Sequence, residues 1–168
     1  MSNIGIYPGT FDPITFGHID IIKRSLKIVK KLIVAVSSDS NKDFFFTDEE
    51  RVLIIKNSLF KDLNFNKNDI KVIHFNTLTT ALCKKYNATT LFRGLRAASD
   101  FEYEFQLAGM NRKLDKNIET VFLMADIDKQ VISSKFVKEI AKLNGKIDNF
   151  VSKSTIKAIN KKIWLKKY

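Results

Sequence analysis

The chain has little of the residues that interrupt or cross-link a fold. Its 168 residues include one cysteine, two prolines and six glycines. A single cysteine excludes an intrachain disulfide and any metal site rich in cysteine. We interpret Cys83, which follows Ala81 and Leu82, as a small core residue. So few prolines and glycines predict few long loops.

Long hydrophobic runs are missing too. No apolar stretch approaches the roughly 18 residues that a membrane span requires. The segment from Met1 to Gly5 shows no basic region followed by an apolar one, so we expect no secretory signal. We therefore expect a cytoplasmic protein without a membrane partner. The hydrophobic content of 45% predicts one globular domain over residues 1–168.

Negative charge is scarce relative to positive charge. The 29 lysines and arginines exceed the 18 acidic residues, which gives a formal net charge of +11. Such an excess fits proteins that bind nucleic acid or other phosphates, but scattered, solvated lysines give the same total. Only five of the basic residues are arginine, which favours solvated lysine. We expect no nucleic-acid partner, because clusters of arginine with aromatic residues are absent. A basic nucleic-acid-binding domain is the alternative from another function class.

Apolar runs typical of buried strands alternate with helical patterns along the chain. Strands are expected at residues 4–7, 32–36, 70–75, 89–92 and 120–124. Helices are expected at residues 19–30, 47–59, 78–86, 99–113, 134–143 and 155–166, and capping boxes open those that begin at Thr47 and Ser99. This alternation predicts an α/β, Rossmann-like fold: a five-stranded parallel sheet with helices on both faces.

The stretch from Tyr7 to His18, Tyr-Pro-Gly-Thr-Phe-Asp-Pro-Ile-Thr-Phe-Gly-His, links the first strand to a helix. Backbone N–H groups and the positive end of a helix dipole make such a turn a place to hold phosphate. Gly17 lets the backbone approach a phosphate closely. The imidazole of His18 can donate to an oxygen that gains charge during phosphoryl chemistry. The alternative is a plain loop with His18 solvated in the first helical turn.

The tetrapeptide Arg93-Gly94-Leu95-Arg96 is expected just after the fourth strand. Arginine binds phosphate oxygens with two parallel hydrogen bonds, and two arginines around a glycine could grip one polyphosphate. The alternative is a surface turn with two exposed arginines. Lys42 follows the second strand, and Ser133 and Ser134 follow the fifth, where they could cap a helix. Because ligands lie at the carboxyl ends of parallel strands, we predict that these segments share one rim.

The first stretch resembles the nucleotidylyltransferase superfamily, whose mark is similar to Thr15-x-Gly17-His18. The full twelve residues look like those of the bacterial phosphopantetheine adenylyltransferases, and residues 93–104 look like that family's second motif. The resemblance reaches from the first strand to the helix at Ser134. It implies Mg²⁺-dependent transfer of adenylate from ATP to 4′-phosphopantetheine, giving dephospho-coenzyme A and pyrophosphate. The attack on the α-phosphate would be in line, without a covalent enzyme intermediate.

The resemblance also implies roles for single residues. Thr10 and His18 would hold oxygens around the reacting phosphorus, and Lys42 and Arg93 the attacking phosphate. Thr79, with Thr10, Lys42 and Arg93, would bind the substrate. The residues implied around ATP are Thr10, Phe11, His18, Gly94, Leu95, Arg96, Glu104, Lys129, Gln130, Val131, Ile132, Ser133, Ser134 and Lys135.

Three of these positions depart from the family pattern. Lys129 stands where an aromatic residue over the adenine is common, and Thr79 where a larger apolar residue is common. Lys135 replaces a frequent serine or threonine. A lysine in the first turn of a helix opposes the helix dipole, and a bound anion would reverse that effect. We therefore hypothesise that Lys135 helps to bind the ATP phosphates.

The resemblance further implies a homohexamer and names coenzyme A as a candidate feedback ligand. Mg²⁺ would be held largely by the substrate and water, since the sequence has no His/Cys metal cluster. An alternative within the superfamily is a different phosphorylated acceptor, such as nicotinate mononucleotide or glycerol phosphate, and the run Arg93–Arg96 argues against it. We interpret His74 as a buried or edge histidine of the third strand rather than a catalytic one.

Overall fold

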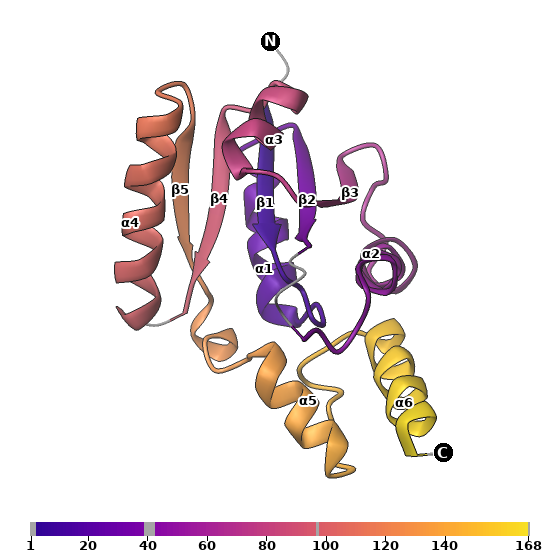
Figure 1. Ribbon diagram of the computed structural model, residues 1–168. Coiled ribbons are helices and arrows are strands. Elements are labelled where there is room, and N and C mark those ends of the chain that lie inside the picture. Colours follow the sequence, from indigo (N-terminus) through magenta and orange to yellow (C-terminus); the bar gives the residue numbers. More distant parts are fainter. Residues whose placement is uncertain (1–2, 39–42, 97, 168) are drawn as a thin grey trace.

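The computed structural model describes residues 3–38, 43–96 and 98–167. Within these ranges a sheet of five parallel strands has the order β3-β2-β1-β4-β5 (Figure 1). The strands are β1 (Ile4–Gly9), β2 (Lys31–Ser37), β3 (Ile70–Phe75), β4 (Thr90–Leu95) and β5 (Glu119–Met124). The predicted parallel sheet is confirmed, and His74 lies exposed on the edge strand β3.

Helices cover both faces of this sheet. They are α1 (Phe16–Ser25), α2 (Asp48–Asn57), α3 (Thr79–Tyr86), α4 (Ala98–Leu114), α5 (Ser134–Lys142) and α6 (Lys153–Lys167). A short π-helix (Ser58–Asp62) continues α2, and a 3₁₀ turn (Ile127–Lys129) precedes α5. α5 and α6 lie beyond the carboxyl ends of the strands (Figure 1). In the ranges described, no helix has both the length and the apolar character that a membrane span demands.

The uninterrupted apolar run of β2 serves two separate hydrophobic cores. Leu32 and Val34 belong to the core that α1 and α2 cover, whereas Ile33 and Ala35 belong to the core on the α3 side. Successive side chains of a strand point to opposite faces, so a strand buried on both faces is apolar throughout. Cys83 of α3 is fully buried in the second core, as predicted.

Several predicted boundaries are wrong in ways that affect the site. α1 begins at Phe16 rather than residue 19, so His18 lies in its first turn. β4 continues to Leu95, because it pairs with β5 as far as Leu95↔Met124. Most of the arginine tetrapeptide therefore belongs to β4, and it does not form a turn after that strand. The capping box of Thr47 and Glu50 is confirmed, whereas α4 begins before Ser99.

The strand order reverses between β1 and β4. The chain runs outward from β1 through β2 to β3, and then returns to β4 on the other side of β1. β1 pairs with β2 along its full length but with β4 only at Gly5↔Thr90 and Ile6↔Leu91. β4 then diverges from β1 toward its carboxyl end (Figure 1). Ligands of open α/β sheets lie in the crevice at such a reversal.

We predict that Gly5→Ala destabilises the protein while Gly109→Ala does not. A Cβ on Gly5 would lie 2.4 Å from Cε2 of Phe92, inside a packed core. Relief of that overlap should cost about 1–3 kcal/mol of unfolding free energy. A Cβ on Gly109 of α4 meets nothing within 4 Å, and alanine favours a helix over glycine by up to about 1 kcal/mol. Urea unfolding of both variants measures the difference, and equal stability of the two would contradict this packing.

Candidate active site

A cleft of about 570 Å³ opens at the carboxyl ends of β1 and β4. Its walls come from the turn after β1, the first turns of α1 and α5, the end of β4 and one face of α4. The predicted site residues that line it are Thr10, His18, Thr79, Arg93, Gly94, Arg96, Glu104, Ile132, Ser133, Ser134 and Lys135. The prediction of a shared rim is confirmed for these segments. Lys42 lies outside the described residues.

The ring of His18 is held by the residue that starts its own helix. The backbone N–H of Thr15 donates to Nδ1 of His18 at 3.1 Å, and the Thr15 hydroxyl lies 2.9 Å from the same nitrogen. Because Nδ1 accepts the backbone N–H, a neutral ring carries its proton on Nε2. Nε2 is therefore the hydrogen-bond donor that the half-buried ring offers to the cleft.

His18 is uncharged at neutral pH. Burial, and to a smaller extent the positive charge of Arg96, together lower its pKa from 6.5 to about 4. Desolvation disfavours the charged imidazolium, and a neighbouring cation adds to that effect. At neutral pH the ring can donate one directed hydrogen bond, but it does not bring a positive charge to the cleft.

Phe11 supports His18 from behind. Its backbone has φ 48°, in the left-handed region, and its ring is only 1% exposed. The ring makes edge contacts with His18 and Tyr7, at centroid distances of 5.1 and 5.3 Å. Phe11 is one of the residues predicted around ATP; its side chain lies in the core, so only its main chain could meet a ligand.

Arg93 is anchored by groups of the protein. Its Nε and Nη2 donate to the two carboxylate oxygens of Glu104 at 2.6 and 2.5 Å, and Nη1 donates to the Pro8 carbonyl at 3.1 Å. The contact with Pro8 spans the gap where β1 and β4 diverge. A guanidinium has five N–H groups, so these bonds leave one on each Nη. Arg93 is thereby fixed in orientation and still has donors for a phosphate.

Arg96, the second arginine of the tetrapeptide, is also paired with α4. Its backbone N–H and its Nε donate to Oδ2 of Asp100 at 3.1 and 3.2 Å. Its side chain is about half exposed, at 47%. Both arginines that were predicted to grip phosphate therefore have carboxylate partners on α4, a relation that the sequence did not reveal.

The first turn of α5 also lines the cleft. The Ser133 hydroxyl accepts the Phe136 N–H at 3.1 Å, which confirms a helix cap there. The Ser134 hydroxyl donates to the Pro13 carbonyl at 2.7 Å, so it ties α5 to the turn after β1. Lys135 is exposed and lines the cleft beside them. The positive end of this helix therefore faces the region of His18.

The other predicted ATP residues do not line the cleft. Leu95 is a core side chain at 5% exposure. Lys129 forms an ion pair with Asp126 at 2.9 Å, Gln130 donates to the Ala125 carbonyl, and Val131 is 77% exposed. Their contact with ATP stays a prediction.

Sequence reasoning missed two buried charged residues behind the site. Arg51 is fully buried in α2, and its Nη1 donates to the carbonyls of Thr10 and Ser37 at 2.7 and 3.0 Å. Asp12, 5% exposed, accepts hydrogen bonds from two backbone amides. Arg51 could have been found from its place on the same helix face as the buried Ile54 and Ile55.

Side chains that bind metals do not cluster among the described residues of the cleft. Among the described residues, no group of three or more His, Cys, Asp or Glu side chains could hold a metal ion. Its carboxylates, Asp100 and Glu104, are already engaged by the two arginines. The residues present therefore do not fit a resident Mg²⁺ ion.

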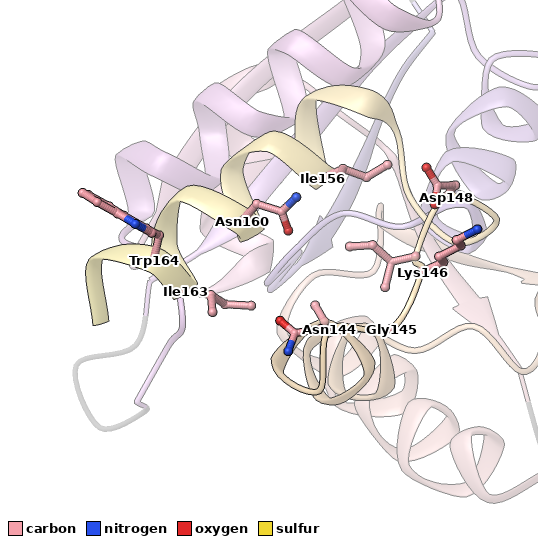
Figure 2. Close-up of a pocket in the computed structure, with 10 residues that line it drawn as sticks. Asn144, Gly145, Lys146, Asp148, Ile156, Asn160, Ile163 and Trp164 are labelled. Atoms are coloured by element: carbon pink, nitrogen blue, oxygen red, sulfur yellow. The ribbon is translucent and has the colours of Figure 1, made fainter. Parts of the chain in front are cut away.

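A second hollow, of about 510 Å³, lies between the end of α5, the loop after it and α6. Figure 2 shows Asn144, Lys146 and Asp148 on one side of it, with Asn160 and Trp164 on α6. None of the predicted site residues that the structure describes lines it. We therefore assign the candidate chemistry to the cleft at β1 and β4.

Comparison with known proteins gives a family. The family model described as cytidylyltransferase-like matches residues 6–140. A protein of Pelagibacter ubique named phosphopantetheine adenylyltransferase is 59% identical over 162 residues, covering 96% of this chain and 99% of its own length. A protein of the same name from Wolbachia pipientis is 53% identical and covers 91% of this chain and 89% of its own.

A solved structure supports the fold. The nicotinic acid mononucleotide adenylyltransferase of Plasmodium falciparum, complexed with APC, aligns with a TM-score of 0.70. The alignment covers 96% of both chains at 19% sequence identity. At that identity the likeness concerns the arrangement of strands and helices, and not the substrate.

We predict that the ring of His18 stays neutral down to about pH 5, since its pKa lies near 4. NMR titration of the imidazole measures this. The chain has two histidines, so a His74→Gln variant leaves one imidazole and assigns the signal. Between pH 6.5 and 4 the unfolded chain binds the proton more tightly than the folded one, so the contribution of His18 to stability declines as the pH falls. A midpoint between 6 and 7 would contradict the buried, neutral ring.

Proposed function

The chain belongs to the phosphopantetheine adenylyltransferases of the cytidylyltransferase-like family, and on this basis we propose that it transfers adenylate from ATP to 4′-phosphopantetheine. The products would be dephospho-coenzyme A and pyrophosphate. The observation that carries the proposal is that His18, Arg93 and the first turn of α5 meet in one cleft at the strand-order reversal.

The chemistry needs no nucleophile from the protein. The phosphate of the acceptor is already ionised and can attack the α-phosphorus of ATP in line, with pyrophosphate leaving. Catalysis then consists of positioning and of stabilising charge on the phosphoryl oxygens. Nε2 of His18 would donate to an oxygen of the α-phosphate, and the neutral ring fits a donor rather than a proton source.

The acceptor would bind on the side of Arg93. The free N–H groups of Arg93, with Thr10, would hold the attacking phosphate; the share of Lys42 in this rests on the family resemblance. A narrow hollow of about 60 Å³ continues from the cleft beside Arg93 and Thr79, and Leu91 and Leu107 line it. This partly apolar space has room for a small part of the pantetheine arm.

ATP would bind between α1 and α5. Ser133, Ser134 and Lys135 lie where a triphosphate could meet the positive end of α5, so Lys135 would add a charge where a hydroxyl is common in the family. Because the described part of the cleft offers no metal cage, Mg²⁺ would enter with ATP as part of the substrate. We expect this reaction to take place in the cytoplasm.

We also propose that the protein forms a homohexamer and that coenzyme A acts as a feedback ligand. Large apolar side chains are exposed along α4, namely Phe101, Tyr103, Phe105, Met110 and Leu114. Phe101 and Phe105, with ring centroids 5.7 Å apart, lie on one side of α4, and Tyr103, Met110 and Leu114 lie on the other. Exposed apolar side chains on both sides of one helix fit an interface between subunits. Sedimentation velocity measures the assembly, and inhibition of pyrophosphate release by coenzyme A measures the feedback.

Pyrophosphate release should require ATP, Mg²⁺ and 4′-phosphopantetheine together. Omission of the acceptor, or addition of excess EDTA, should reduce release to background. Mass spectrometry should identify dephospho-coenzyme A as the adenylylated product. Faster turnover with nicotinate mononucleotide would show that the acceptor is misassigned, and tight DNA binding without any turnover would support the alternative of a nucleic-acid-binding domain.

Arg93→Lys should lower kcat/KM for 4′-phosphopantetheine by about 10- to 100-fold, although the charge is kept. Lysine cannot make the paired bonds to Glu104 and still reach Pro8 and a phosphate. Arg112→Lys is the matched control, because Arg112 also pairs with a glutamate, Glu119, but is 59% exposed away from the cleft. Equal, small effects of both substitutions would remove Arg93 from the substrate site.

A further inference from the structure

Asp12 binds the segment that precedes α2. It lies in the turn between β1 and α1, and its carboxylate is buried, at 5% exposure. Its two oxygens accept the backbone N–H groups of Phe45 and Phe46 at 2.9 and 3.0 Å. These amides belong to the described residues 43–46, which immediately follow Lys42.

The same carboxylate also binds α5. Nζ of Lys138 donates to Oδ2 of Asp12 at 2.8 Å, across 126 residues of sequence. The ammonium group also lies 6.0 Å from the centre of the Phe45 ring. Lys138 is one helical turn beyond Ser134, whose hydroxyl binds the carbonyl of Pro13. Asp12 is thus the point where three segments of the chain meet.

Two of these segments carry groups of the proposed site, and the third follows Lys42 in the sequence. The turn after β1 carries Thr10 and leads to His18, the segment before α2 follows Lys42, and α5 begins with the serines that cap it. Asp12 itself does not line the cleft. A buried carboxylate is costly unless it is paired, and here two amides and an ammonium group satisfy it.

We propose that Asp12, through Lys138, is a positioning residue that sets the distance between the turn after β1, the segment following Lys42 and the first turn of α5. The proposal rests on the adenylyl transfer proposed above. The groups that would hold the acceptor phosphate and those that would hold ATP lie on different segments. A carboxylate that binds these segments fixes the distance between the two sets of groups. A misplacement of about 1 Å can cost about 100-fold in rate.

Asp12→Asn tests this against a matched control, Asp62→Asn. Asp62 also accepts a backbone N–H, that of Ser154 at 2.7 Å, and the Ser154 hydroxyl at 3.0 Å, but the two segments that it joins, Ser58–Asp62 and α6, carry no residue that lines the cleft. Both variants should lose stability. Only Asp12→Asn should lower kcat by about 10- to 100-fold at a temperature where both are fully folded. Loss of stability with unchanged kcat in both would overturn the proposal.

Lys138→Met gives a second test that does not require an active enzyme or a tolerated change at Asp12. Lys138 does not itself contact the amides of Phe45 and Phe46. Its loss should make the carboxylate of Asp12, which accepts hydrogen bonds from both amides, more mobile. Hydrogen exchange at those two amides should accelerate by roughly tenfold. The control is Lys142→Met, one turn further along α5 and exposed, which should leave their exchange unchanged.

The two substitutions should also be non-additive, because they remove one linkage. The double variant should lose no more activity than Asp12→Asn alone, whereas independent roles would give the product of the two single losses. Unchanged exchange at Phe45 and Phe46 in Lys138→Met, or additive losses, would overturn the proposal. Absence of pyrophosphate release in the unmodified protein would instead count against the proposed function, and the exchange experiment would still decide the anchoring role.

Discussion

The site depends on the separation of β1 and β4. These two neighbouring strands pair only at Gly5↔Thr90 and Ile6↔Leu91, so their carboxyl ends are free to diverge. That divergence opens the cleft, and the guanidinium of Arg93 spans it to reach the Pro8 carbonyl. The other segments of the site, including the first turns of α1 and α5, line this opening.

The electrostatics of the cleft are arranged before any ligand binds. Arg93 and Arg96 are held by Glu104 and Asp100 of α4. These ion pairs fix the orientation of the two guanidinium groups without using all of their N–H donors. His18 is kept neutral by burial and by the charge of Arg96, and Thr15 orients its ring. Preorganised donors of this kind suit a reaction in which charge moves among phosphoryl oxygens, since little reorganisation is needed during the reaction.

Buried charges hold the loops that carry these groups. Arg51 joins the Thr10 carbonyl to the end of β2, and Asp12 joins the same turn to the segment before α2 and to α5. Both are costly to bury alone, and each forms hydrogen bonds with backbone groups far away in sequence and an ion pair, Arg51 with Asp48 and Asp12 with Lys138. The rim of the sheet is therefore cross-linked by ionic hydrogen bonds rather than by apolar packing alone.

The sequence by itself determined the order of strands and helices and the location of the Tyr7–His18 and Arg93–Arg96 motifs, because apolar periodicity and short motifs are local properties. It did not determine that β4 continues through Arg93, that Phe11 turns into the core, or that Glu104 and Asp100 hold the arginines. It gave no sign of Asp12 meeting Lys138 across 126 residues. Only the tertiary structure decided these contacts, because each depends on which segments far apart in the sequence pack together. A local sequence pattern carries no information on such packing.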